Sequence, residues 1–151
     1  MVANDLLREV PLLRIGEPVA AAVETILAAG VAALPVVDER DEFRGIFGER
    51  EFIGALFPGY LGTLKYAGFV PHSLDSEIEC RSDCLAEEVG RHLNRDHVDV
   101  GEDYSDAELA EIFLHHRVLI VPVVDRERHV RGVVTRSGFF AALATRAREL
   151  S

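Results

Sequence analysis

The sequence predicts a mixed fold of the α/β (α+β) class. It consists of two β-α-β-β-α units that are related by pseudo-twofold symmetry. The main observation is a phrase of the form hydrophobic-Pro-Val-Val-Asp, which occurs twice and is followed each time by an Arg-Gly strand. A helix-like stretch precedes both copies, and every match has the same offset of 87 residues. The matching segments are 34–38 and 121–125, 44–47 and 131–134, and 19–30 and 106–117. Agreement in both spacing and pattern indicates an internal duplication.

The composition is that of an acidic, soluble chain of one domain. Its 151 residues are 48% hydrophobic and carry a formal net charge of -10, and a chain of this length can bury a sizeable core. Nucleic-acid phosphates and anionic membrane surfaces require clustered Lys and Arg, so neither is an expected partner. The longest uncharged run, 52–64, is interrupted by Pro58 and is too short to span a bilayer. We expect a cytoplasmic protein.

The first unit begins with a short apolar segment that leads into a helix. Pro18 suits the first position of this helix and Gly30 its end. From Val19, apolar residues recur at i, i+4, i+7 and i+8, which forms one helix face. The apolar segment comprises Leu6, Leu7, Leu12, Leu13 and Ile15. Two strands and a second helix are expected at 34–37, 43–48 and 50–57.

The second unit repeats this order with its own local signals. Val98 and Val100 mark its first strand, and the turn that follows is expected to be two residues longer than in the first unit. Ser105 and Glu108 form an S-x-x-E capping box at the start of the helix. Two further strands and a final helix are expected at 118–124, 130–135 and 137–149. One such unit cannot cover both faces of its small sheet, so the two units should pack together.

The chain is therefore divided into a first repeat at 6–57, a connector at 58–92 and a second repeat at 93–150. An unstructured connector of this length would be unusual in a compact protein, so we expect it to be largely helical. Its helices would cover the core or contact a second subunit. Cys80 and Cys84 in the connector fit no common zinc spacing, so we expect two ordinary thiols, with a redox disulfide or a metal site as the alternatives.

The sequence resembles a tandem pair of CBS domains, named after cystathionine beta-synthase. The resemblance rests on both copies of the phrase, on the Arg-Gly strands and on the run Thr135-Arg136-Ser137 before Phe139. The resemblance covers both units and leaves out the connector. It implies a pseudo-twofold sandwich that dimerises, and a regulatory role without catalysis. The implied effectors are adenosine-containing ligands held between the units: AMP, ADP, ATP or S-adenosylmethionine. No required cofactor is implied.

The resemblance also implies where such a ligand would bind. The family has Ser/Thr-x-x-Asp after the Arg-Gly strand, with the hydroxyl meeting phosphate or ribose and the carboxylate accepting from ribose hydroxyls. In the second unit Thr135 fills the hydroxyl position and Gly138 replaces the Asp, whereas the first unit has Gly48 and Glu51. The expected ligand-binding residues are Thr135, Arg136, Val121 and Pro122 at a first site, and Glu51, Pro35 and Val36 at a second. Further phosphate candidates are Arg44, Arg131 and His116. Thr135 is also expected to cap the helix that it precedes.

Two classes of function remain open. The first, which the resemblance favours and which we expect, is a sensor of an adenosine-type ligand. The alternative is a dimerisation or partner-binding module that needs no nucleotide, which the incomplete Ser/Thr-x-x-Asp pairs favour. An enzyme is not expected, because the sequence has no G-x-S-x-G, no P-loop and no H-E-x-x-H motif. The expected partners are a second copy of the chain, an adenosine-type small molecule and a regulated protein.

Overall fold

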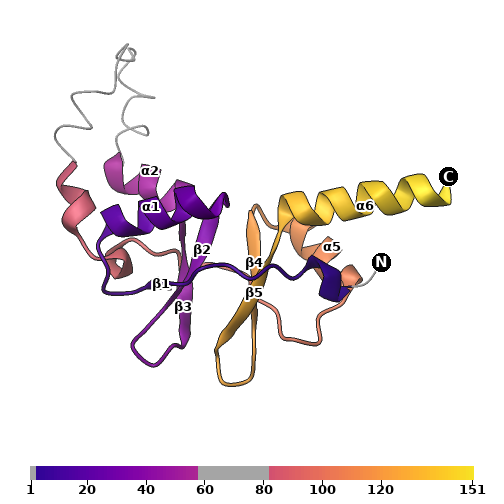
Figure 1. Cartoon of the computed structure of the whole chain (residues 1–151), viewed down its shortest axis with the longest axis horizontal. Coiled ribbons are helices and arrows are strands. Elements are labelled where there is room, and N and C mark those ends of the chain that lie inside the picture. Colours follow the sequence, from indigo (N-terminus) through magenta and orange to yellow (C-terminus); the bar gives the residue numbers. More distant parts are fainter. Residues whose placement is uncertain (1–2, 58–81) are drawn as a thin grey trace, which may run out of the picture.

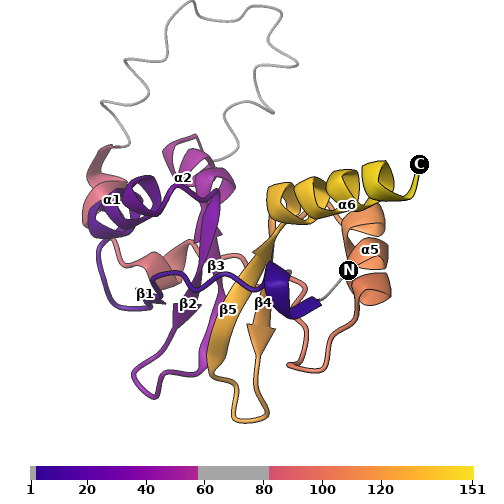
Figure 2. The same ribbon diagram turned by 45° about the vertical axis from the view of Figure 1, so that its right-hand side comes forward.

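The computed structural model describes residues 3–57 and 82–151, which form two units of the same design (Figure 1). The first unit contains β1 (Leu13–Arg14), α1 (Val19–Ala29), β2 (Ala33–Val37), β3 (Phe43–Gly48) and α2 (Glu49–Leu56). The second contains α5 (Asp106–His115), β4 (Ile120–Val124), β5 (Val130–Thr135) and α6 (Arg136–Leu150). Figures 1 and 2 show the helices of each unit gathered beside the strands of that unit. The predicted mixed α/β fold is confirmed.

Strand pairing repeats at the predicted offset. Ala33 lies opposite Gly48 in the antiparallel pair β2–β3, and Ile120 lies opposite Thr135 in the pair β4–β5. Both pairs have a register shift one residue before the strand ends, between Val36 and Val37 in one and at the equivalent position in the other. This agreement in detail shows that the two copies of the phrase have the same conformation.

The first strand of each unit also keeps this offset. Leu13 pairs in parallel with Val36, and Val100 pairs in parallel with Val123. The helices that follow begin at equivalent residues, so the prediction of a longer turn in the second unit was wrong. The error came from extending the first strand to Ile15, because Leu13 is the counterpart of Val100 and β1 ends at Arg14.

Each unit receives backbone pairing from the segment that precedes the other. Arg8 exchanges two hydrogen bonds with Val133 of β5, at 2.8 and 2.9 Å. Asn94 does the same with Ile46 of β3, at 2.7 and 3.1 Å. The N-terminal segment therefore crosses from the second unit to the first, as Figure 1 shows. Leu6 and Leu7, predicted to lead into the first unit, pack against the core of the second.

In the described part of the chain, three clusters of apolar side chains form the core. One lies within each unit, and the third joins them across the seam between β2–β3 and β4–β5. The seam cluster comprises Ala33, Phe43, Ile46, Ile120, Val124 and Val133. It includes residues that occupy equivalent positions in the two units, for example Ile46 and Val133. The duplicated strands therefore bury one face against each other, as expected for units that cannot cover their own sheets.

Local signals set most helix ends. Gly30 ends α1 in the left-handed conformation, at φ 67°, as predicted. The hydroxyl of Ser105 accepts from the Glu108 N–H at 3.2 Å, which confirms the predicted start of α5. Thr135 caps α6 in the same way, through the Gly138 N–H at 3.0 Å. Pro18 lies at the N-cap of α1, one position before the predicted one.

The aspartate of each repeated phrase shapes the turn after its strand. Asp38 accepts from the N–H groups of Arg40 and Glu42, at 2.9 and 3.1 Å. Asp125 accepts from those of Glu127 and His129, both at 2.9 Å. The bond from His129 contributes most to holding the pKa of Asp125 below its ordinary value. These carboxylates are therefore part of the fold and are engaged by their own turns.

Most of the connector lies outside the described residues, including Cys80 and the greater part of the predicted helices. Its final part forms two short 3-10 helices, Ser82–Ala86 and Val89–Arg91. They dock on the first unit, where the Val19 N–H donates to the Glu87 carbonyl at 2.9 Å. The side chain of Cys84 is buried. Within the described chain, no helix is long and apolar enough to cross a membrane.

Candidate functional site

A cavity of about 480 Å³ lies between the two units. Its walls come from the end of α1, the start of β4 and the starts of α2 and α6. It is lined by Arg8, Gly30, Val31, Ala32, Glu49, Leu119, Ile120, Thr135, Arg136, Ser137 and Phe140. A cavity of this volume can hold a nucleotide-sized ligand.

Residues that the pseudo-twofold symmetry relates to each other line the cavity from both units. Ala32 and Leu119, which both line it, occupy equivalent positions, as do Glu49 and Arg136. The backbone repeats this equivalence, because Glu49 N–H donates to the Ala32 carbonyl at 2.9 Å and Arg136 N–H to the Leu119 carbonyl at 3.0 Å. Since the equivalent side chains carry opposite charges, the cavity is chemically asymmetric. A bound ligand would therefore have one preferred orientation.

Thr135 and Arg136 are the two expected ligand residues that the structure brings into this cavity. The Thr135 hydroxyl oxygen accepts from the Gly138 N–H and lies 3.5 Å from the Ser137 hydroxyl. A Cβ at position 138 would lie 2.8 Å from this hydroxyl oxygen. The cap geometry therefore favours glycine at the position where the family has aspartate.

The remaining expected residues lie elsewhere. Val121 and Val36 are fully buried in β4 and β2, and the neighbouring Pro122 and Pro35 are buried as well. None of these four residues lines the cavity. Val121 and Pro122 follow Ile120, which lines the cavity, in β4, and Pro35 and Val36 hold the equivalent positions in β2.

Glu51 also lies outside the cavity, and the protein itself satisfies its carboxylate. Burial raises the pKa of Glu51 above its ordinary value, against hydrogen bonds from the N–H groups of Glu51 and Gly48 and from the Asn94 side chain, which favour the charged form. Asn94 belongs to the segment that crosses to β3. A ribose at Glu51 would have to displace this contact.

We expect Glu51→Gln to stabilise the protein increasingly as pH rises. Because the pKa is raised in the folded state, the stability linked to protonated Glu51 is present below the unfolded-state pKa and is lost as pH rises through the folded-state value. Thermal unfolding of both proteins between about pH 4 and about pH 8 measures this effect. The advantage of the variant should be smallest at the acid end, and an advantage that shrinks with rising pH would contradict the buried carboxylate.

The phosphate candidates differ in whether they already face a carboxylate and in whether they line the cavity. Arg44 lies 3.8 Å from Asp38, and Arg131 lies 3.2 Å from Glu102, so each already faces a carboxylate. His116 is exposed at the end of α5 and lies outside the cavity. Of the predicted candidates, Arg136 alone lines the cavity.

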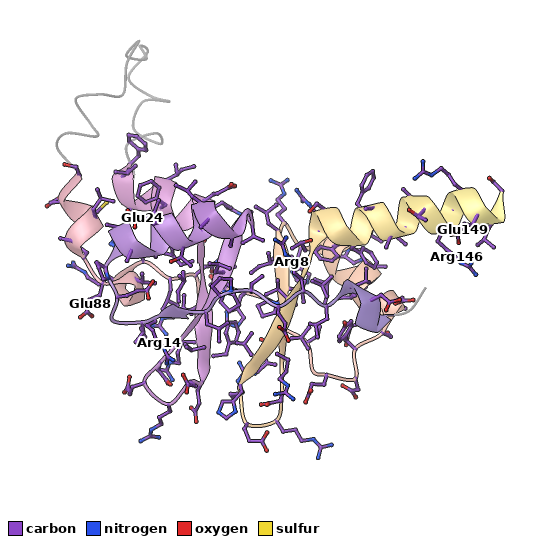
Figure 3. All side chains as sticks on the ribbon, viewed as in Figure 1. Arg8, Arg14, Glu24, Glu88, Arg146 and Glu149 are labelled. Atoms are coloured by element: carbon purple, nitrogen blue, oxygen red, sulfur yellow. The ribbon has the colours of Figure 1, made fainter. Side chains whose placement is uncertain are left out.

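Sequence reasoning missed Arg8, which enters the cavity from the N-terminal segment. Its guanidinium donates to the Ala29 carbonyl at the end of α1, at 3.0 Å. Figure 3 labels Arg8 between α1 and the start of α6. A signal was available, because Leu6 and Arg8 recur as Leu93 and Arg95 at the offset of 87. The duplication thus extends upstream of the first strands.

Solved structures of CBS domain proteins share the fold of this chain. A CBS domain-containing protein of unknown function from Bacillus anthracis str. Ames Ancestor has a TM-score of 0.72 at 17% identity, covering 96% of this chain and 94% of that one. CBSX2 in complex with AMP has a TM-score of 0.67 at 17% identity, with coverages of 93% and 94%. The CBS domain pair of MJ0100, in complex with 5-methylthioadenosine and S-adenosyl-L-methionine, has a TM-score of 0.71 at 18% identity, with coverages of 97% and 98%.

Comparison with curated proteins gives no match to the chain. The CBS domain family matches it twice, at residues 3–58 and 86–145. These two segments contain both copies of the repeated phrase and both crossing residues, Arg8 and Asn94. Their sequence match and the shared fold lead to the same conclusion: the chain belongs to the CBS domain family and consists of a tandem pair of CBS domains.

Proposed function

We propose that this chain is a regulatory module without catalytic activity of its own, which senses an adenosine-containing ligand in the cavity between its two units. The proposal rests on the observation that both units line the same cavity. Thr135 and Arg136 come from the second unit, and Gly30, Val31 and Ala32 from the first. A ligand held there contacts both units at once. It can shift the arrangement of the units only by as much as its affinity for the two arrangements differs.

The chemistry of the walls suits such a ligand. Val31, Leu119, Ile120 and Phe140 offer apolar surface against which a purine can pack. The hydroxyl of Thr135 and its neighbours at the start of α6 offer polar groups, and a helix N-terminus favours phosphate. AMP, ADP, ATP and S-adenosylmethionine are therefore the first ligands to test. The complexes of CBSX2 with AMP and of MJ0100 with S-adenosyl-L-methionine support this choice.

We also propose that the module acts as a homodimer. Helix α6 carries three exposed apolar side chains, Phe140, Leu143 and Leu150, of which Phe140 and Leu150 are each 70% exposed. Their spacing brings them toward one side of the helix. An apolar stripe of this kind is more stable when a partner covers it. Analytical ultracentrifugation should give twice the mass of one chain, and the mass of a single chain would overturn this part of the proposal.

Thermal unfolding with AMP, ADP, ATP and S-adenosylmethionine, each with and without Mg²⁺, tests the ligand. A ligand at a hundred times its dissociation constant stabilises by about 2.7 kcal/mol, and each kcal/mol raises Tm by roughly 2–4 °C for a chain of this size. Thr135→Ala should lose most of this rise, because it removes the hydroxyl at the cavity.

Ser105→Ala is the matched control for Thr135→Ala. Both changes remove an N-cap hydroxyl, so each should destabilise the free protein by about 0.5–2 kcal/mol. Only Thr135 lines the cavity, so the ligand-induced rise should survive in Ser105→Ala. If no compound raises Tm while the chain remains a dimer, the ligand proposal fails. The function would then be that of a dimerisation or partner-binding module that needs no nucleotide.

A further inference from the structure

Arg8 is tied to both units and also lines the cavity. Its backbone pairs with Val133 of the second unit, and its guanidinium donates to the Ala29 carbonyl of the first at 3.0 Å. Leu6 and Leu7 before it pack against the second core, and Leu13 after it is buried in the first. The backbone at Arg8 is therefore anchored on both sides, and its side chain is held at the rim of the cavity.

The charges around the cavity favour an anion. Its ionisable lining residues are Arg8, Arg136 and Glu49, two cations against one carboxylate, in a chain whose formal net charge is -10. Among the residues that the structure describes, neither arginine has a carboxylate within ion-pair distance, unlike Arg131. A guanidinium has five N–H donors. The one side-chain bond of Arg8 to Ala29 leaves most of them available.

We infer that Arg8 makes the cavity selective for adenosine ligands that carry phosphate, over uncharged or cationic ones. The inference rests on the proposed function and adds the charge class of its ligand. A guanidinium binds phosphate through a planar fork of donors, and a charged acceptor is stronger than the Ala29 carbonyl. S-adenosylmethionine carries a sulfonium and an ammonium group against one carboxylate, so it is a net cation, which two arginines disfavour. Arg8 acts here as a specificity-determining residue that lies outside both repeated phrases.

Isothermal titration of AMP, adenosine and S-adenosylmethionine into the full chain tests the inference. The wild-type chain should bind AMP at least about tenfold more tightly than the other two, which corresponds to about 1.4 kcal/mol. Arg8→Met keeps an unbranched, flexible side chain and removes the charge. It should lower AMP affinity by about tenfold and change adenosine affinity by less than about twofold. Arg8→Lys should retain part of the preference, because it keeps the charge without the fork.

Arg95→Met is the matched control, because Arg95 is the counterpart of Arg8 at the offset of 87 and lies outside the cavity. It should bind all three compounds as the wild-type chain does. Equal losses for AMP and adenosine in Arg8→Met would assign Arg8 a purely structural role and overturn the inference. So would wild-type binding of S-adenosylmethionine as tight as that of AMP, although the proposed sensor would then stand. Absence of binding by all three compounds would overturn the proposed ligand itself.

Discussion

Gly132→Ala is expected to destabilise the protein strongly, because it blocks the crossing of the N-terminal segment. A Cβ at this position would lie 2.7 Å from the Arg8 carbonyl oxygen and 2.9 Å from a methyl group of Leu7. The φ of Gly132, 158°, is also one that other residues rarely adopt. Backbone strain and overpacking each cost about 1–3 kcal/mol, so we expect a loss of about 2–5 kcal/mol. Thermal unfolding should show a fall in Tm of roughly 5–20 °C.

Gly16→Ala provides the control for this change. A Cβ at Gly16 meets no atom within 4 Å, so this variant should unfold within about 0.5 kcal/mol of the wild-type chain. If Gly132→Ala unfolds at the same temperature as Gly16→Ala, the segment around Arg8 does not cross β5 as described. Because Arg8 would move with its backbone, Gly132→Ala should also weaken any ligand contact that this side chain makes.

Gly48→Thr is expected to destabilise the first unit without creating a ligand site. The change restores the hydroxyl that the family has at this position, so the sequence alone would predict a gain of binding. However, a Cβ at Gly48 would lie 2.3 Å from the Ala32 carbonyl oxygen and 2.4 Å from the Ala33 Cβ. Overpacking of this kind costs about 1–3 kcal/mol. Tm should fall by roughly 2–12 °C, and the response to AMP should not increase.

The equivalent Thr135 is tolerated because its backbone differs. Thr135 has φ −88° and ψ 148°, whereas Gly48 has φ −162° and ψ −155°. Gly54→Thr, in the helix after Gly48, is the matched control, since a Cβ at Gly54 meets nothing within 4 Å and threonine is no worse than glycine in a helix. A Gly48→Thr variant as stable as Gly54→Thr, or one that gains affinity for AMP, would contradict this account of the first unit.

The sequence predicted the fold well because its signals are local and occur twice. The strands around the repeated phrases, the end of α1 at Gly30 and the caps at Ser105 and Thr135 all follow from the conformational preferences of a few neighbouring residues. The assignment of Leu6 and Leu7 to the first unit was wrong, whereas the other errors were small shifts, in the position of Pro18 and in the length of the turn after Val100. Neither changes which elements pair, because the offset of 87 residues holds throughout both units.

The candidate site was predicted only in part. Thr135 and Arg136 could be found because the repeated phrase leads directly to them. The position of Val121 and Pro122 away from the cavity could not be predicted. Every residue of β4 is buried, and only the tertiary packing decides that Val121 joins the core of the second unit while Ile120 lines the cavity. The engagement of Glu51 by Asn94 likewise depends on a segment that joins the sheet from the other unit.

Length, charge, duplication and the order of helices and strands therefore follow from the sequence, because each depends on composition or on residues close together in the chain. The crossing of the two preceding segments does not, and neither do the contact of Arg8 with Ala29 and its place in the same cavity as Arg136. These contacts join residues far apart in the chain. They exist because each unit adds backbone pairing to the sheet of the other and buries one face of it. The same packing places a cationic cavity within an acidic protein.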